Sequence, residues 1–259
     1  MTALQASIFG ILLITASTFF GSSAVFFVKS EMSNKFKTII LGLGAGIMLS
    51  CALFGLTSES IEYSFADSEG IFAIIPIGVG FTLGILTLVG FGYLSKRIKR
   101  KENSSLSIHG EKMFFAVASH NIPEGLGVGF VCGAAFISES STAIFAVISI
   151  SIALAIHNLV QGITISLSMY GEGTKKQTAF TYMAITGIIE AIFAVIGIFI
   201  ANSLENLMPW LLAFAGGAMT YIAIEDLYPE ALEGGEHNLA VLSFFVAFVI
   251  MMMFELYFE

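Results

Sequence analysis

Near the middle of the chain, an imidazole and a carboxylate are spaced to share one helical face. The segment AVASHNIPEGLGVGF carries His120 and Glu124 four residues apart, with Asn121 next to the histidine. In an α-helix, residues i and i+4 lie one above the other, about 6 Å apart along the axis. An imidazole nitrogen and a carboxylate oxygen placed in this way can bind one divalent cation from a single helix.

A second segment repeats this pattern with one change. The sequence ALAIHNLVQGITISL carries His157, Asn158 and Gln161, so glutamine stands where the first copy has glutamate. A third segment, ITGIIEAIFAVIG, contains the single carboxylate Glu190 in an apolar run. Imidazole and oxygen ligands without a thiolate suit Zn, Fe, Mn, Co or Cd and disfavour Cu(I).

The segments that hold these residues are apolar enough to cross a membrane. Hydrophobic residues make up 56% of the 259 residues and charged residues 12%, and the mean hydropathy is +0.90. About a quarter of the residues of a soluble domain are charged, and a bilayer-crossing helix needs roughly 20 mostly apolar residues. The prediction is an all-α membrane protein, a single transmembrane domain over residues 1–259. Its eight helices are predicted at residues 4–28, 38–58, 71–95, 113–137, 142–169, 177–202, 208–228 and 239–258.

Other classes of protein are excluded by composition or by missing motifs. The net charge is −8 and there are only two cysteines, which excludes a nucleic-acid-binding protein and a disulfide scaffold. The sequence contains neither HExxH, which an intramembrane metalloprotease would need, nor the GxxxxGK[ST] of an ATPase. We therefore expect a multi-pass protein of the lipid bilayer, in the cell membrane, that is not an enzyme.

The basic residues predict the orientation of the chain. If eight helices alternate in direction, all 11 Lys and Arg residues fall on one side. Short cytoplasmic loops hold the excess of basic residues, so this side is predicted to be cytoplasmic and both termini extracytoplasmic. The residues concerned are Lys29, Lys35, Lys37, Lys96, Arg97, Lys99, Arg100, Lys101, Lys112, Lys175 and Lys176.

Acidic residues gather near both predicted membrane surfaces, and each group has two interpretations. The outer group either attracts cations or forms an ordinary polar rim. The inner group, at the end of the seventh helix, either receives the ion or consists of ordinary interfacial carboxylates. The outer residues are Glu59, Glu62, Asp67 and Glu69, and the inner ones are Glu225, Asp226 and Glu230.

The polar residues within the predicted helices lie at one depth. Glu124, His157 and Glu190 each fall within about one residue of the middle of a predicted helix. Ionisable groups in hydrocarbon are costly and usually mark a functional site. Because the fourth and fifth helices run in opposite directions, two copies of one motif at this depth indicate an inverted repeat with a site between the copies. Two alternatives stay open: Gln161 could be structural, and Glu190 could relay a proton.

The motif HNIPEG at 120–125, its partner HNLVQG at 157–162 and the eight helices together resemble the ZIP (Zrt/Irt-like) family of divalent metal transporters. The segments GLGAGIMLSCALFGLTSESIE and AGGAMTYIAIEDLYPEALE add to this resemblance. It implies a 3+2+3 bundle with inverted repeats around the fourth and fifth helices, transport of zinc or a similar ion toward the cytoplasm, and a homodimer. It also implies metal-site positions at His120, Asn121, Glu124, His157, Asn158, Gln161 and Glu190.

The chain departs from the family pattern at Gln161, where members usually carry a glutamate that often bridges two metals. We therefore predict a site for one ion, with His120, Glu124, His157 and Gln161 as ligands and with Glu190 and the asparagines in auxiliary positions. The predicted function is zinc uptake by alternating access, with no cofactor other than the transported ion. The alternative is a proton-coupled carrier of another substrate that uses Glu124 and Glu190 as proton sites.

Overall fold

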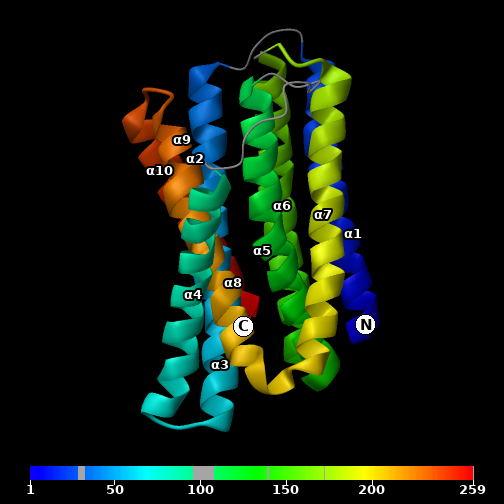
Figure 1. Ribbon diagram of the computed structural model, residues 1–259, viewed down its shortest axis with the longest axis vertical. Helices are drawn as coiled ribbons and strands as arrows, with labels where there is room; N and C mark the ends of the chain where they lie inside the picture. Colours follow the sequence, from blue (N-terminus) through cyan, green and yellow to red (C-terminus); the bar gives the residue numbers. More distant parts are fainter. Residues whose placement is uncertain (29–32, 96–107, 139, 172, 259) are drawn as a thin grey trace.

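The computed structural model describes residues 1–28, 33–95, 108–138, 140–171 and 173–258. The side chains of Lys112 and His120 also lie outside the described part. In that part, eight helical segments are long and apolar enough to cross a membrane, and Figure 1 shows them packed into one bundle. The predicted fold class, an all-α membrane protein with eight spans, is confirmed.

Two of the eight segments are built from more than one helix. The helices are α1 (Ala3–Phe27), α2 (Asn34–Ser50), η1 (Cys51–Thr57), α3 (Ser58–Asp67), α4 (Ile71–Ser95), α5 (Ile108–Ser138), α6 (Ser141–Gly171), α7 (Lys176–Ser203), η2 (Glu205–Leu207), α8 (Met208–Ile222), η3 (Ala223–Leu227), α9 (Tyr228–Leu232) and α10 (His237–Phe258). The π-helical turns η1 and η3 join their neighbours without a break, so α2 to α3 form one span and α8 to α9 another.

The second span is longer than predicted. Instead of residues 38–58 it covers α2, η1 and α3, so Glu59 and Glu62 lie on a helix and the expected outer break shrinks to residues 68–70. Hydrogen bonds hold the extension: the Ser60 hydroxyl donates to the Pro209 carbonyl at 2.7 Å, and the Ser64 hydroxyl to the Ala73 carbonyl at 2.6 Å. The seventh span likewise continues through Leu232, and the other ends differ from the prediction by at most about one and a half turns.

The spans form two groups, each held by close helix pairs. In the first group α5 packs against α7 and α1 against α6; in the second, α2 packs against α10 and α4 against α8. In Figure 1 the first group lies to the right of the second. A Cβ atom on Gly129 would overlap the Ala194 carbonyl oxygen, and one on Gly46 would overlap that of Phe244. Glycine therefore permits the close contact of these backbones.

The two groups also show the symmetry that an inverted repeat requires. Exchanging α1 with α7, α2 with α8, α4 with α10 and α5 with α6 converts each of the four main helix pairs into another of them. The π-helical turns obey the same exchange, since η1 follows α2 and η3 follows α8. This pattern agrees with the predicted 3+2+3 arrangement.

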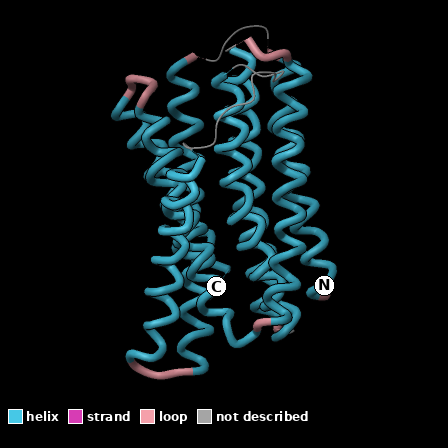
Figure 2. Tube along the Cα trace, viewed as in Figure 1, coloured by secondary structure: helices cyan, strands magenta, loops and turns pink. Residues whose placement is uncertain are grey.

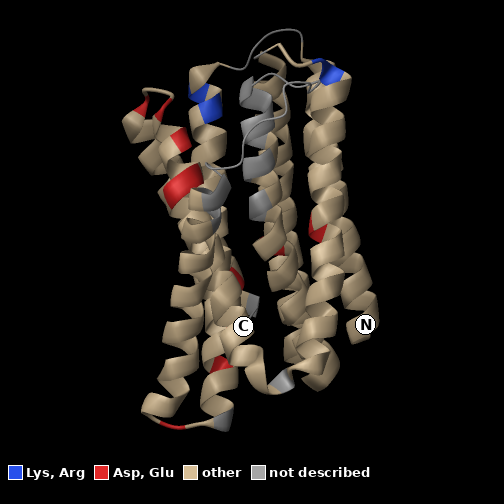
Figure 3. Cartoon of the chain, in the orientation of Figure 1, with Lys and Arg blue, Asp and Glu red and all other residues tan. Residues whose placement is uncertain are grey.

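The described basic residues and the two termini occupy opposite ends of the bundle. Both termini lie in the lower half of Figure 1, and loops in the described part lie at the two ends (Figure 2). The described basic side chains, at the starts of α2 and α7, lie at the upper end in Figure 3. There Lys37 pairs with Glu230 at 3.1 Å, and Lys35 with Glu236 at 3.5 Å.

The membrane orientation itself stays a prediction. Six of the basic residues on which it depends lie outside the described residues: Lys29, Lys96, Arg97, Lys99, Arg100 and Lys101.

Candidate metal site

The predicted polar residues lie inside the first helix group. The helix α5 carries Asn121 and Glu124, while α6 carries His157, Asn158 and Gln161 and α7 carries Glu190. Their side chains are at most 4% exposed. Because these positions fall near the midpoints of their helices, the polar atoms lie far from both ends of the bundle.

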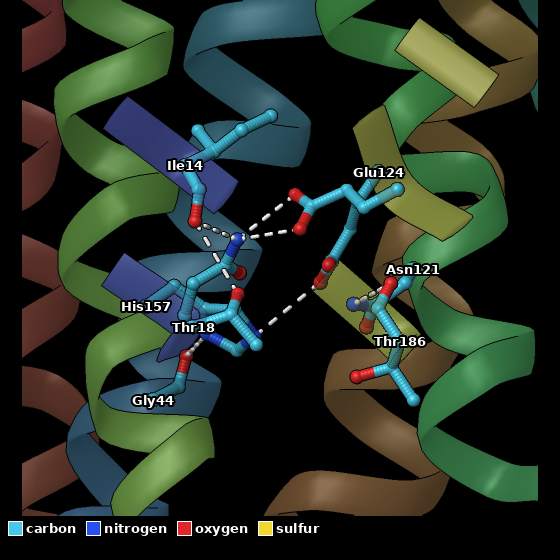
Figure 4. Close-up of polar contacts among 9 residues, drawn as sticks. Ile14, Thr18, Gly44, Asn121, Glu124, His157 and Thr186 are labelled. Carbon is cyan, nitrogen blue, oxygen red and sulfur yellow. Dashed lines mark hydrogen bonds and ion pairs between the residues drawn. The ribbon is translucent and has the colours of Figure 1, made fainter. Parts of the chain in front are cut away.

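An imidazole and a carboxylate from two helices meet in this interior. His157 Nε2 lies 3.3 Å from Glu124 Oε1, and both side chains appear in Figure 4. Two ligands that are 2.0–2.1 Å from one zinc ion at tetrahedral angles lie about 3.3–3.4 Å from each other. The separation of this pair is therefore the one that neighbouring ligands of a bound ion require.

Several polar atoms around this pair are buried without a hydrogen-bond partner among the described residues. Such atoms are rare because each costs about 1–3 kcal/mol. Most of them are acceptors, which a cation would satisfy. They are Asn121 Oδ1, Glu124 Oε1 and Oε2, His157 Nε2, Asn158 Oδ1, and Gln161 Oε1 and Nε2.

Glu190, in contrast, has hydrogen-bond donors. The Asn158 Nδ2 atom donates to its two carboxylate oxygens at 2.9 and 2.7 Å, and lies 3.4 Å from the Ile14 carbonyl oxygen. Asn121 Nδ2 donates to the Thr186 carbonyl at 3.2 Å. The asparagine amides thus connect helices of the first group and leave their own oxygen atoms without donors in the described part.

The described side chains supply part of the predicted ligand set. Among them no group of three or more His, Cys, Asp and Glu residues is placed to hold a metal. The direct pair is Glu124 with His157, and Gln161 lies one turn beyond His157 on α6. His120 lies one turn before Glu124 on α5, and its side chain is outside the described part.

Sequence reasoning missed the backbone partners of these side chains. The ring of His157 points its Nδ1 at the Gly44 carbonyl oxygen, 3.2 Å away on α2. The carbonyl oxygens of Ile14 and Thr186 contact the two asparagines in the same manner. Since every residue has a carbonyl group, no residue type could have indicated these contacts.

Eight apolar spans around a buried imidazole and carboxylate define an integral, multi-pass membrane protein with a cation-compatible interior. The family model described as ZIP Zinc transporter matches residues 95–255, and the chain belongs to the ZIP family. This is a family of transporters rather than enzymes, in agreement with the sequence-based expectation.

Three relatives illustrate how far the similarity extends. The chain is 26% identical to "Zinc transporter ZIP11" of Homo sapiens, over 89% of this chain and 91% of that protein. It is 34% identical to "Zinc transporter ZIP11" of Bos taurus, again over 89% and 91%. "Zinc transporter ZupT" of Chlorobaculum parvum is 28% identical over 85% of each chain. The similarity therefore covers most of the chain in each comparison.

Proposed function

We propose that this protein transports a divalent metal ion, zinc foremost, through the buried site that contains Glu124 and His157. One observation carries the proposal: the separation of 3.3 Å between His157 Nε2 and Glu124 Oε1 in a fully buried setting. The three relatives are named zinc transporters, which supports zinc as the ion. The buried acceptor atoms around the pair that have no hydrogen-bond partner among the described residues are a second reason for a cation to bind.

The proposed site holds one ion. Glu124 and His157 bind it directly, and His120 and Gln161, each one helical turn from one of them, complete the shell. Glu190 stays an auxiliary carboxylate because Asn158 donates to both of its oxygens. The two buried carboxylates together offset the charge of a divalent cation, which would otherwise be prohibitive in this interior.

Alternating access follows from where the proposed ligands lie. They all belong to α5, α6 and α7, which are in the first helix group. Movement of this group against the second would therefore carry the proposed ligands together from one side toward the other. A membrane potential contributes about 2.3 kcal/mol per charge per 100 mV, and thus about twice that for a divalent ion moving toward the cytoplasm.

We also propose the cell membrane as the location and a homodimer as the assembly. The homodimer is implied by the family resemblance, and the mass of the purified protein in detergent tests it. A purely monomeric species at the concentrations used for transport would contradict this part of the proposal.

Uptake into proteoliposomes tests the function. The purified protein is reconstituted and offered Zn, Fe, Mn, Co and Cd in turn, with His120→Ala and Glu124→Ala as site variants. The exposed Glu62 provides the matched control, Glu62→Ala. We expect zinc uptake that falls at least tenfold in both site variants and persists in the control.

Two results would contradict the proposal. Proton flux with no metal present would identify a proton-coupled carrier that uses Glu124 and Glu190. Zinc uptake that is equal in the wild type and in Glu124→Ala would remove the buried pair from the transport site.

A further inference from the structure

The ring of His157 has a different partner on each of its two sides. Its Nδ1 lies 3.2 Å from the Gly44 carbonyl oxygen, and its Nε2 lies 3.3 Å from Glu124 Oε1. Figure 4 shows Gly44 and Glu124 on opposite sides of the ring. The side chain is 1% exposed, so bulk water does not reach either nitrogen.

The carbonyl side determines which nitrogen can bind a metal. A carbonyl oxygen only accepts hydrogen bonds, so the nitrogen that faces it must carry a hydrogen atom. In a neutral imidazole with hydrogen on Nδ1, the lone pair is on Nε2, which faces Glu124. Metal-binding histidines generally depend on such a contact from the other ring nitrogen for their tautomer and orientation.

We infer that the Gly44 carbonyl is the positioning group that makes Nε2 the metal-binding atom of His157. This inference rests on the proposed function and deepens it, because it assigns the ligand atom and its support. Gly44 lies on α2, in the second helix group, whereas His157 lies on α6, in the first. The support of this ligand therefore crosses the surface along which the two groups meet.

State-dependent affinity follows from this placement. When the first group moves past α2, the ring of His157 leaves the Gly44 carbonyl and loses the contact that fixes it. The site then binds its ion less tightly in the state that has moved. Binding on one side and release on the other would thus depend on one hydrogen bond between the groups.

The carbonyl, and not the missing side chain of Gly44, carries this role. A Cβ atom at position 44 would lie 3.5 Å from Val160 Cγ1 and 3.8 Å from His157 Nδ1, which are ordinary contacts. There is thus room for a methyl group at this position, so the absence of a side chain is not what orients the ring.

Nitrogen NMR of the full chain tests the assignment. The protein is labelled with ¹⁵N-histidine in detergent, and His157→Gln identifies the signals of His157 among the four histidines. We expect a protonated Nδ1 without metal, and scalar coupling of Nε2 to bound ¹¹³Cd. A bare Nδ1, or coupling of cadmium to Nδ1, would overturn the inference. Absence of any cadmium or zinc binding would instead contradict the proposed function.

An ester in the backbone tests the positioning role without changing any side-chain shape. Replacing Ala45 by its α-hydroxy analogue turns the Gly44 carbonyl into an ester carbonyl, which is a weaker acceptor. The same exchange at Ile47 removes one helical N–H but leaves the Gly44 carbonyl intact, and is the matched control. Loss of a hydrogen bond to the second ring nitrogen of a metal-binding histidine typically lowers metal affinity 10–100-fold. We therefore expect about a tenfold higher Kd for zinc in the Ala45 ester and no change in the Ile47 ester. Equal Kd values in both ester variants would overturn the inference.

Discussion

Asn158 on α6 holds both carboxylate oxygens of Glu190 on α7, with its single side-chain nitrogen 2.9 and 2.7 Å from them. The two side chains are fully buried. Glu124, in the same interior, has no hydrogen-bond donor among the described residues. Of these two carboxylates at one depth, Glu190 accepts hydrogen bonds at both oxygens, whereas Glu124 accepts none from the described residues and has both oxygens available for a cation. Residue type alone does not reveal this difference.

The contact between Asn158 and Glu190 predicts a measurable coupling. Asn158→Ala leaves a buried carboxylate without its donor, so it should lower the free energy of unfolding by about 1–3 kcal/mol. In a Glu190→Ala background the same substitution should cost less, because it then removes only the contact of Asn158 with the Ile14 carbonyl. Unfolding of the four proteins in detergent gives the interaction energy of the pair. Effects that simply add would show that the two side chains do not interact.

Glu124→Gln should separate stability from transport. The amide of Glu124→Gln keeps the volume and shape of the carboxyl group, so the thermal midpoint should stay close to that of the wild type. Zinc uptake should fall at least tenfold, because the amide lacks the charge. Glu62→Gln, at an exposed position, should change neither. A variant that unfolds at lower temperature would mean that the Glu124 charge is stabilised within the metal-free protein.

External pH should control uptake through the imidazoles. Imidazole binds metal only in its neutral form, so protons compete with the ion and uptake should decline as the external pH is lowered. Initial rates in proteoliposomes at a series of pH values measure this decline. His237→Gln, on the exposed start of α10, should keep the full pH dependence. Zinc uptake that stays flat across this pH series would refute the hypothesis.

Packing within the first helix group depends on small residues. A methyl group at Gly129 would collide with the Ala194 carbonyl and with Gly197, so Gly129→Ala should destabilise the fold by about 1–3 kcal/mol. A methyl group at Gly78 on α4 would meet, apart from the neighbouring backbone of its own helix, no described atom within 4 Å. Gly78→Ala should therefore be neutral or stabilise by up to about 1 kcal/mol. Thermal unfolding in detergent compares the two, and equal losses would contradict close packing at Gly129.

Labelling of single cysteines tests the predicted orientation. Cys51 and Cys132 are buried and unpaired, so a Cys51→Ala/Cys132→Ala background removes both native thiols. In intact cells, a membrane-impermeant thiol reagent should label Glu69→Cys and leave Lys175→Cys unlabelled until the membrane is permeabilised. The reverse pattern would place the basic end of the bundle outside.

The sequence predicted the number of spans because an uninterrupted run of about 20 apolar residues is typical of a bilayer-crossing helix. It predicted the candidate site because ionisable residues within such runs are conspicuous. It did not predict the length of the second helix. Polar residues from Ser58 onward end the apolar run, but they do not end the helix, which continues to Asp67. Hydropathy detects the hydrocarbon layer, and a helix can leave that layer without stopping.

The separate roles of the two carboxylates in the site could not be assigned from the sequence. Glu124 and Glu190 are both single carboxylates near the middle of apolar helices. Which of them receives the Asn158 amide depends on how each helix is rotated about its axis, and this rotation is determined by packing against neighbours. The Gly44 contact depends on the same rotations, together with a carbonyl group that every residue possesses.

The wide turn η1 lets the second span hold one residue more than an uninterrupted α-helix would. Its backbone hydrogen bonds close over five residues instead of four, and the Thr57 hydroxyl also donates to the carbonyl of Ala52, five residues earlier, at 2.6 Å. Because the turn absorbs the extra residue, deleting one residue from it would restore ordinary helical geometry and leave the helix beyond it facing the same way. Ser60 and Ser64 would then keep their acceptors on α8 and α4, whereas the same deletion from an ordinary α-helix would rotate them by about 100°. Relatives with an uninterrupted α-helix at this point are therefore expected to show a one-residue gap in a sequence alignment.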